Sequence, residues 1–571
     1  MSGIFGILDP KGPDPDQLAE AAERNAARGS PTVLVTGLWA VGILENERVS
    51  SSIARDGDSI ALAWGRIDGS VARPGAASDD SPAEVVARAV RDRGSAGLED
   101  LAADYAFAKV SSDGHAFLTR DAFGMRPLYW ARRGERVGFS TDPDVLVHLG
   151  LIDQDLDPET VRRHLMFLPP RGSRTALSGL RQVVGGRWVD IGANTESGGR
   201  WFRPERVRQE PGLGRAQAAA MFEERLMAAV DSRARGKVLL SLSAGRDSGA
   251  IAVALAATGA NAATITLVLE GDEASDEREG AKGLASSVGL PWSSVSVPAS
   301  VTRTDIDRAV RSMGPTAFPA FPLALAMVDA AAAGGADVLM DGTGGEPLFS
   351  ASPVVVVDLI KRGRFSDAVT CARVYDRKWT YDTKFIVKTA ARAVAPRTLL
   401  GLREQARRVA PWVVQDRCRA VDVDAPRTAR QHLVASLAEQ GRSDSGRLFQ
   451  ALSHDSGLEY AAPLLDLRLV DLALRLPDDQ RAPLPHPKPV YAKVLGDLER
   501  TRRKTRQTRY FKYLAHMFQR DHPGCFDPRG VLASTGLVEV QWLPAVADDR
   551  WYIDSLPLVP LSAWLQLTEE A

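Results

Sequence analysis

The chain contains 571 residues, of which 44% are hydrophobic and 25% are charged, and its formal net charge is −1. This length allows at least two domains with sizeable cores, and the composition is typical of a soluble globular protein. The near-neutral charge gives no reason to expect nucleic-acid or membrane-surface binding. The three cysteines are far apart and not in metal-ligand spacing, so we expect a cytoplasmic protein without a zinc site or a disulfide framework.

The first two hundred residues contain short apolar runs separated by turn residues, for example at 32–35, 60–64, 105–110 and 114–119. Such spacing is typical of mainly antiparallel β-structure. A polar segment at 202–214, interrupted by proline and glycine, is the best candidate for a linker. The sequence therefore predicts one domain over residues 1–205 and a second over residues 215–571.

An apolar strand, a glycine-containing turn and a helix follow one another over residues 237–255. In this order, backbone N–H groups, two hydroxyls and the positive helix end can converge on a polyphosphate. A Gly-x-x-x-x-Gly-Lys-Ser/Thr motif is missing, so the loop favours pyrophosphate as a leaving group: a carboxylate is adenylated by ATP, and an amine then displaces AMP. A polar turn without a ligand is the alternative. The predicted cofactor-binding residues of this turn are Ser243, Ala244, Gly245, Arg246, Asp247 and Ser248, with Asp247 also a predicted Mg²⁺ ligand.

The alternation of strands and helices continues after this turn. Strands are predicted at 264–269, 293–297 and 337–340, and helices at 276–288, 304–312 and 321–333. Strands separated by helix-length crossovers predict a parallel sheet with helices on both faces. A second glycine-rich turn follows the last strand, with Asp341, Gly342, Thr343 and Gly344 as predicted nucleotide contacts and Glu346 as a second predicted Mg²⁺ ligand. Taken alone, this segment is equally consistent with a plain tight turn.

Several motifs together resemble those of asparagine synthetase-like proteins. They are residues 2–6 (Ser-Gly-Ile-Phe-Gly), residues 120–129, the turn at 243–248, the turn at 342–346, and Gly457-Leu458-Glu459-Tyr460 followed by residues 463–466. The resemblance implies an N-terminal α+β glutamine-amidotransferase-like domain of the Ntn type, followed by an α/β ATP-pyrophosphatase synthetase domain. It also implies that adenine and ribose contact the backbone near Leu242, Leu269 and Asp341-Gly342, and that Asp247 and Glu346 hold Mg²⁺.

Two departures from the family argue against the use of glutamine. Members that use glutamine carry a cysteine after the initiator methionine, whereas this chain has Ser2. They also carry an Asn-Gly-Glu stretch that builds the oxyanion site, and the corresponding residues here are Trp64-Gly65-Arg66. Because one oxyanion donor is commonly worth about 10²–10³ in rate, we expect no glutaminase activity.

Two branches of the family without a working glutaminase fit this pattern, β-lactam synthetases and lasso peptide cyclases. β-Lactam synthetases carry a tyrosine in the second glycine turn, where this chain has Thr343. The turn at 341–345 and the segments 358–364 and 561–565 are more similar to lasso peptide cyclases. Two further departures concern the nucleotide site: Ala244 replaces a glycine, and Glu346-Pro347 replaces an Asp-Glu pair.

The resemblance also implies two catalytic residues. Lys504 would stabilise the adenylate and the tetrahedral intermediate, with Arg502, Arg503 and Arg506 as competing candidates in the same basic segment. Glu459 would orient or deprotonate the attacking amine, and its alternative role is that of a structural ion-pair partner.

The sequence thus predicts an ATP- and Mg²⁺-dependent lasso peptide cyclase. It would adenylate an Asp or Glu side chain of a core peptide and join it to the N-terminal amine of that peptide. The resemblance implies two partners, a leader-binding protein and a leader peptidase, and neither nucleic acid nor a membrane. The alternatives are a β-lactam synthetase-like ligase of small molecules, an ammonia-using asparagine synthetase, or a degenerate nucleotide-binding scaffold without activity.

Overall fold

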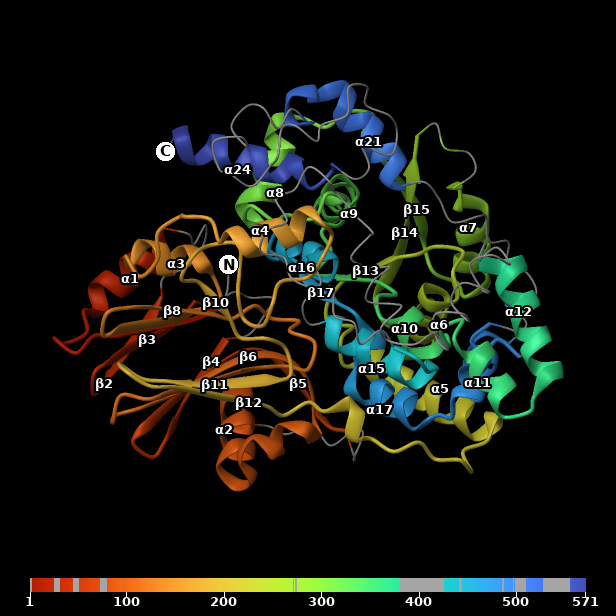
Figure 1. Cartoon of the computed structure of the whole chain (residues 1–571), viewed down its shortest axis with the longest axis horizontal. Coiled ribbons are helices and arrows are strands. Elements are labelled where there is room, and N and C mark those ends of the chain that lie inside the picture. The colour runs from red at the N-terminus through yellow and green to blue at the C-terminus, as the bar shows by residue number, and fades with distance from the viewer. Residues whose placement is uncertain are drawn as a thin grey trace.

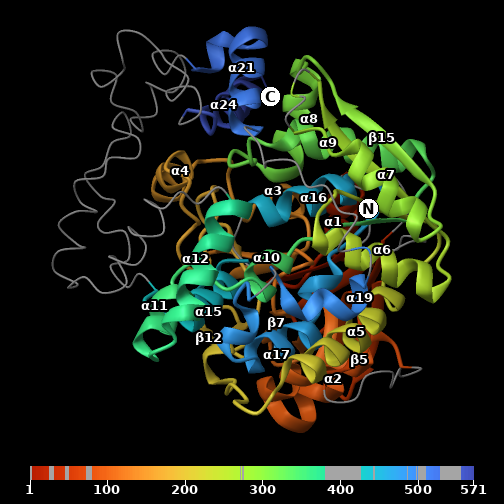
Figure 2. The ribbon, with the colours of Figure 1, turned by 90° about the vertical axis from the view of Figure 1, so that its right-hand side faces the viewer.

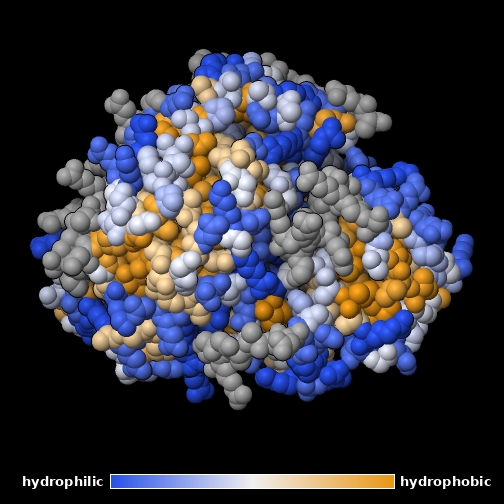
Figure 3. All heavy atoms as spheres, turned by 180° about the vertical axis from the view of Figure 1, so that it is seen from behind, coloured by the Kyte–Doolittle hydropathy of each residue, from blue (hydrophilic) through white to orange (hydrophobic). Residues whose placement is uncertain are grey.

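The computed structural model describes residues 3–24, 31–44, 51–71, 80–270, 272, 275–379, 426–440, 444–484, 487–496, 498, 510–526 and 555–570. Within these ranges, no helix has both the length and the apolar composition needed to cross a membrane. On the face that Figure 3 shows, hydrophilic residues interrupt the hydrophobic areas.

The N-terminal part is built from two six-stranded antiparallel sheets, as the alternating apolar runs predicted. The first sheet has the order β10-β8-β9-β1-β3-β2 and comprises β1 (Gly3–Leu8), β2 (Thr32–Thr36), β3 (Trp39–Leu44), β8 (Tyr129–Arg133), β9 (Arg136–Ser140) and β10 (Arg181–Gln182). The second has the order β12-β11-β7-β6-β5-β4 and comprises β4 (Ser51–Asp56), β5 (Ser59–Ser70), β6 (Leu101–Ser111), β7 (Ala116–Arg120), β11 (Arg187–Ile191) and β12 (Glu196–Arg200). Side chains from both sheets, among them Trp39, Trp64 and Leu118, pack into one core between them.

Four helices of this part begin in the same way. They are α1 (Pro15–Glu23), α2 (Pro82–Arg93), α3 (Pro143–His148) and α4 (Pro158–Leu165). Each starts with a proline that follows an Asp or Ser N-cap whose side chain accepts backbone N–H groups of the first turn. A proline at the first helical position and a short polar cap are a favourable helix start. Helices α1 and α3 cover the first sheet and α2 packs on the second, so the layers are α, β, β and α (Figure 1).

The C-terminal part contains one five-stranded parallel sheet. Its order is β15-β14-β13-β16-β17, with β13 (Val238–Ser241), β14 (Ala262–Leu269), β15 (Trp292–Val297), β16 (Val338–Met340) and β17 (Glu459–Ala461). The predicted strands and crossover helices of residues 237–340 are confirmed. Strand β17 was not predicted, because three residues are too short for a pattern and its partner β16 lies more than a hundred residues earlier in the chain.

Helices cover both faces of this sheet. One face is covered by α5 (Arg215–Asp231), α6 (Arg246–Thr258) and α7 (Arg278–Ser287), and the other by α8 (Arg303–Met313), α9 (Phe321–Ala333) and α16 (Asp444–Asp455). The remaining α-helices of the described chain are α10 (Gly345–Phe349), α11 (Val355–Lys361), α12 (Phe365–Trp379), α15 (Ala429–Gln440), α17 (Leu467–Arg475), α18 (Asp478–Arg481), α19 (Ala492–Leu495), α21 (Tyr510–Asp521) and α24 (Leu558–Glu570).

The two parts share an extensive apolar contact. One hydrophobic cluster contains Phe123 and Trp201 from the first part together with Phe222 and Leu226 of α5. A second cluster joins α4 to the C-terminal helix α24, which lies near α21 in the upper part of Figures 1 and 2. The segment at 202–214 is held to the second part, for example by the N–H of Glu210, which donates to the carbonyl of Arg475 (2.8 Å). The parts are therefore packed together rather than tethered by a free linker.

Candidate active site

The two glycine-containing turns meet at the carboxyl edge of the parallel sheet. Strand β14 pairs with one side of β13 and β16 pairs with the other, so the chain leaves β13 and β16 in opposite directions. Ligands of parallel α/β sheets bind at such a switch point. Leu242, Leu269 and Asp341 stand at or directly after the ends of β13, β14 and β16, so the structure brings together the three positions predicted to contact the nucleoside.

The first turn has the geometry of an anion-binding loop. Gly245 is the N-cap of α6, and Arg246, Asp247 and Ser248 form the first turn of that helix. The hydroxyls of Ser243 and Ser248 lie 3.1 Å apart, and the N–H of Gly245 donates to the hydroxyl of Ser243 (3.0 Å). These hydroxyls and the amino end of α6 thus point into one space, which suits a phosphate group.

Ala244 causes no backbone strain in this turn. In the described chain, Phe167 and Lys488 are the only residues other than glycine with a positive φ. Ala244 therefore avoids the left-handed conformation, which would cost a residue with a side chain about 1 kcal/mol.

The second turn requires glycine because it touches the first. A Cβ on Gly345 would lie 2.2 Å from Oδ1 of Asp247, and a Cβ on Gly342 would lie 3.0 Å from the N atom of Ser248. A side chain at position 345 would displace the carboxylate of Asp247, and one at position 342 would press on the backbone of the first turn. The glycines at 342–345 therefore hold Asp247 and Glu346 next to each other.

Asp247 and Glu346 converge on one cationic nitrogen. Nζ of Lys488 donates to Oδ2 of Asp247 (2.5 Å) and lies 2.9 Å from Oε2 of Glu346. The hydroxyl of Tyr491 donates to the other oxygen of Asp247 (2.8 Å). Two carboxylates around a single positive charge are a donor set that suits Mg²⁺, which binds one or two carboxylates together with substrate phosphates. Among the described residues, no group of three or more His, Cys, Asp or Glu side chains is arranged to hold a metal ion, so these two carboxylates would need the phosphates of the substrate to complete a Mg²⁺ site.

Lys488 and Tyr491 are site residues that the sequence analysis missed. Lys488 is only 5% exposed and has a φ of 52°, a conformation that is strained for a residue with a side chain. Burial and the neighbouring Asp247 raise the pKa of Tyr491 well above its usual value. In the sequence, Lys488 is recognisable only as a lysine between Pro487 and Pro489. This setting is unusual, but it matches no short motif that would predict a nucleotide contact.

A third missed residue, Tyr460, supports the second turn. Its hydroxyl donates to the hydroxyl of Thr343 (3.2 Å), which donates to Oδ2 of Asp341 (3.0 Å). Burial, followed by the charge of Asp341, raises the pKa of Tyr460 well above its usual value, and burial also raises the pKa of Asp341. This chain of hydroxyls fixes the turn at the position where Thr343 replaces the tyrosine of β-lactam synthetases.

Glu459 points away from this chain of hydroxyls. Successive side chains of a strand face opposite sides of the sheet, so Glu459 of β17 lies on the other face from Tyr460. Its Oε1 accepts hydrogen bonds from Nη2 of Arg126 (2.7 Å) and Nη1 of Arg66 (3.3 Å). The geometry favours the ion-pair role, and the catalytic role stays a prediction. Lys504 and Ser2 lie outside the described residues.

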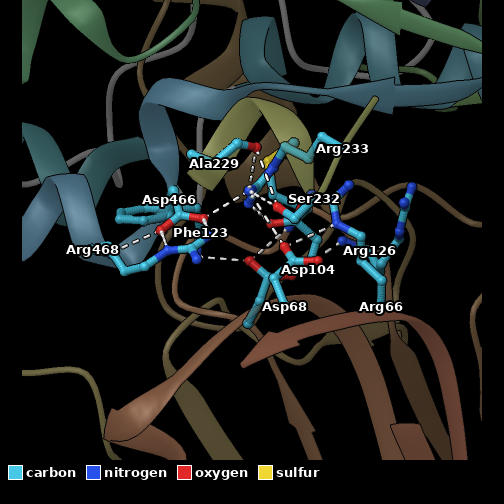
Figure 4. A network of polar contacts seen from close by, with 12 residues as sticks. Arg66, Asp68, Asp104, Phe123, Arg126, Ala229, Ser232, Arg233, Asp466 and Arg468 are labelled. Atoms are coloured by element: carbon cyan, nitrogen blue, oxygen red, sulfur yellow. Dashed lines mark hydrogen bonds and ion pairs between the residues drawn. The ribbon is translucent and has the colours of Figure 1, made fainter. Parts of the chain in front are cut away.

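Through its ion pairs with Arg66 and Arg126, Glu459 belongs to a group of eight buried charges between the two parts of the chain, which we term the interdomain charge cluster; Figure 4 labels its other members. The first part contributes Arg66, Asp68, Asp104 and Arg126, and the second contributes Arg233, Glu459, Asp466 and Arg468. Each part supplies two cations and two anions, and ion pairs such as Arg126–Glu459 and Arg233–Asp104 join the two parts.

Arg233 is at the centre of the interdomain charge cluster. It is 1% exposed, and its guanidinium lies 2.7 Å from Asp466, 3.2 Å from Asp104 and 3.3 Å from Asp68. Burial alone would raise the pKa of Asp466, but Arg233 and Arg468 hold it below its usual value. Burial prevails at Asp68, whose pKa is raised and whose two oxygens have no hydrogen-bond partner.

Comparison with known families agrees with this architecture. The asparagine synthase family matches residues 221–511, about half of the chain. The chain belongs to the asparagine synthase family. The glutamine amidotransferase domain family matches residues 72–202. The fold is therefore an N-terminal glutamine amidotransferase-like domain of the Ntn type followed by an asparagine synthase domain, and the latter is the domain of an ATP-dependent amide-forming ligase. No curated protein matches the chain.

Some solved structures share a distant likeness with this member of the asparagine synthase family. The glutamine phosphoribosylpyrophosphate amidotransferase of B. subtilis is 13% identical with a TM-score of 0.24, and the match covers 51% of this chain and 65% of that chain, less than two thirds of its length. An allosteric regulatory enzyme of purine biosynthesis is 14% identical with a TM-score of 0.26, over 63% of this chain and 78% of that chain. The U34-tRNA thiolase of Methanococcus maripaludis is 14% identical with a TM-score of 0.18, over 41% and 80%.

The position of Glu459 in this asparagine synthase family member leads to a testable expectation. Because Glu459 is 4% exposed and paired with two arginines, Glu459→Gln removes a buried charge and is expected to lower the free energy of unfolding by about 3 kcal/mol. We expect a smaller effect on the rate of the folded enzyme, less than about tenfold. Urea unfolding and single-turnover kinetics measure the two effects. A variant of unchanged stability whose rate falls a hundredfold would instead identify Glu459 as a catalytic residue.

A second expectation concerns His454 of α16, whose ring contacts that of Trp64 of the amidotransferase-like domain (ring centroids 4.9 Å apart, interplanar angle 58°). Burial, followed by positive charges that include Arg126, lowers the pKa of His454 to about 3. The unfolded chain binds the extra proton, so the stability from neutral His454 is complete above about pH 6.5 and is lost as the pH falls toward 3. Between pH 6.5 and pH 4.5 the loss should be about 2 kcal/mol.

This loss is measured as the difference in unfolding free energy between the natural protein and His454→Phe. The difference cancels the contributions of Asp121 and Asp455, whose pKa values burial raises to about 6 and which therefore favour the folded state as the pH falls. A difference that stays constant over this pH range would show that His454 is protonated in the folded protein.

Proposed function

We propose that this chain is a lasso peptide cyclase. It adenylates an Asp or Glu side chain of a core peptide with ATP and forms a macrolactam with the N-terminal amine of the same peptide, releasing AMP and pyrophosphate. A leader-binding protein and a leader peptidase would supply the core peptide. The asparagine synthase domain supports ATP-dependent amide formation. The following observations support ring closure within a peptide.

The observation that carries the proposal is the stretch Trp64-Gly65-Arg66, whose arginine is part of the interdomain charge cluster. The guanidinium of Arg66 is 4% exposed and paired with Asp104 and Glu459. In glutamine-using relatives this stretch is Asn-Gly-Glu, whose asparagine stabilises the oxyanion. Here the position of the asparagine is taken by Trp64, which is 1% exposed and packs in the core between the two sheets, and the position of the glutamate is taken by the paired Arg66. The oxyanion donor is therefore missing, and the amine would come from a source other than glutamine. An amine within the substrate meets that need.

The described residues account for the first half of the reaction. Ser243, Ser248 and the amino end of α6 bind the phosphates, and the glycines at 342–345 allow the nucleotide to approach the backbone. Asp247 and Glu346 would hold Mg²⁺, which neutralises phosphate charge when bound. Lys488 lies beside the same carboxylates, so its ammonium is within reach of the pyrophosphate that leaves. Lys504 is the proposed cation for the second half, attack of the amine on the acyl adenylate.

The test is turnover without any source of ammonia. We expect the purified protein with ATP and the core peptide encoded beside its gene to yield a product lighter by one water, in the absence of glutamine and ammonium. Mass spectrometry measures the ring closure, and a glutamate assay measures glutaminase activity, which should be at background. Product that appears only when glutamine is added, together with released glutamate, would overturn the proposal.

A further inference from the structure

Helix α4 of the amidotransferase-like domain ends in an arrangement that favours glycine. The N–H of Phe167 donates to the carbonyl of His164 (2.8 Å), and the N–H of Leu168 donates to the carbonyl of Arg163 (2.8 Å). This pair of bonds is a Schellman cap, in which the residue at the position of Phe167 is left-handed and usually glycine. Phe167 has a φ of 54°, so its side chain strains the backbone there.

Packing does not explain why a phenylalanine stands at this position. The residue is 41% exposed, so much of its ring does not contribute to a core. The other described residue that combines a side chain with a positive φ is Lys488, which lies at the nucleotide site. A strained backbone position that favours glycine but carries a larger side chain is a candidate for a binding role.

Phe167 lies against Phe511 of the asparagine synthase domain, which in turn lies against Phe318. Its ring centroid is 6.3 Å from that of Phe511 at an interplanar angle of 76°, and the ring of Phe318 is 6.2 Å from that of Phe511 at 81°. Phe511 is 39% exposed and Phe318 is partly buried. We term these three residues the phenylalanine triad. It joins the end of α4, the loop before α9 and the start of α21, which are far apart in sequence.

The phenylalanine triad lies at the same edge of the sheet as the nucleotide site. Strand β16 runs parallel to β13, and α9 is the helix that precedes β16. A helix in this position starts at the carboxyl edge of the sheet, and α9 starts three residues after Phe318. Helix α21 packs on α9 through Phe518 and Phe321 (ring centroids 5.5 Å apart). Figure 1 shows α4, α9 and α21 together in the upper part of the view.

We infer that the phenylalanine triad is a subsite for an aromatic or branched aliphatic side chain of the peptide substrate. This inference rests on the proposed function, because a substrate as small as aspartate has no such side chain. Aromatic rings bind another apolar side chain through edge-to-face contacts. When the side chain of the peptide binds, the two exposed rings lose contact with water, which favours binding. The amidotransferase-like domain thereby contributes to substrate binding although it does not use glutamine.

The first test uses a probe that does not depend on the identity of the peptide. N-acetyl-4-fluoro-L-phenylalaninamide is titrated against the full chain and followed by fluorine NMR, with N-acetyl-L-alaninamide as an unlabelled competitor. We expect millimolar binding that the competitor does not displace, weakened at least fivefold in Phe167→Gly and in Phe511→Ala. The matched control is Phe365→Ala, another exposed phenylalanine (64%), on α12, which should bind as the natural protein does. Absence of binding, or equal binding in all variants, would overturn the inference.

Two further readouts keep the subsite and the proposed function separate. Phe167→Gly relieves the strain, so its melting temperature should be equal to or above that of the natural protein; a clear decrease would show that the ring is needed for the fold and would count against the subsite. In ring closure of the core peptide, Phe167→Gly should raise KM at least fivefold with little change in kcat. Ring closure with an unchanged KM would reject the subsite and leave the proposed function intact, whereas probe binding without any ring closure would support the subsite and reject the proposed function.

Discussion

Asp247→Asn is expected to reduce AMP formation by at least about a thousandfold while the protein stays folded. Asp247 is the acidic residue of the phosphate-binding turn, and Lys488, Tyr491 and Glu346 are arranged around it. The amide keeps the shape of the side chain but removes the charge that would hold Mg²⁺ and balance Lys488. The effect should therefore appear in the adenylation step itself, measured as AMP release from radiolabelled ATP.

The matched control is Asp329→Asn, at a 54% exposed aspartate side chain of α9 that pairs with Arg308 at the surface. It should leave AMP formation unchanged. Circular dichroism and the melting temperature show whether Asp247→Asn is folded. A folded variant that releases AMP at a near-normal rate would remove the turn at 243–248 from the nucleotide site.

Arg233→Met is expected to lower the free energy of unfolding by about 3–5 kcal/mol, the largest stability effect that we expect from one substitution. The change leaves Asp68, Asp104 and Asp466 without their shared cation in a fully buried place. Removal of one member of such a group is costly because the remaining charges stay desolvated. Urea unfolding of the full chain measures the difference, and Arg24→Met, at an exposed pair with Glu20, should change it by less than about 0.5 kcal/mol.

The pH dependence of this effect has a definite sign. In the natural protein the pKa values of Asp104 and Asp466 are held below the usual value, so their contribution to stability is present above about pH 3.8 and is lost as the pH falls further. Without Arg233 these buried carboxyls should bind protons at a higher pH. The stability difference between the natural protein and Arg233→Met should therefore shrink from pH 7 to pH 4.5. A difference below about 1 kcal/mol at pH 7 would mean that the interdomain charge cluster does not hold the domains together.

The sequence predicts the scaffold of the nucleotide site well because its signals are local. Strand β13, the turn and α6 are contiguous, and their apolar runs and glycines can be recognised within twenty residues. The same holds for β14, β15 and β16 and for the helices between them. Their order along the chain, together with the rules for parallel sheets, is enough to bring Asp247 and Glu346 to one edge.

The parts of the site that were not predicted depend on contacts across long stretches of chain. Lys488 meets Asp247 across 241 residues, and the ion pairs of Glu459 with Arg126 and Arg66 span 333 and 393 residues. No periodicity encodes such pairs. The stretch Trp64-Gly65-Arg66 indicated the loss of the oxyanion asparagine but not the ion pair of Arg66 with Glu459, because Glu459 is contributed by the other domain.

The measurement that tests the central claim most directly is ATP–pyrophosphate exchange with two kinds of carboxylate. The account predicts exchange that depends on the core peptide encoded beside the gene and stays at background with free aspartate or glutamate, because the activated carboxylate belongs to a peptide. Mutation of the single acidic acceptor side chain of that peptide to its amide should abolish the exchange. Robust exchange with free aspartate or another small amino acid, and none with the core peptide, would contradict the account.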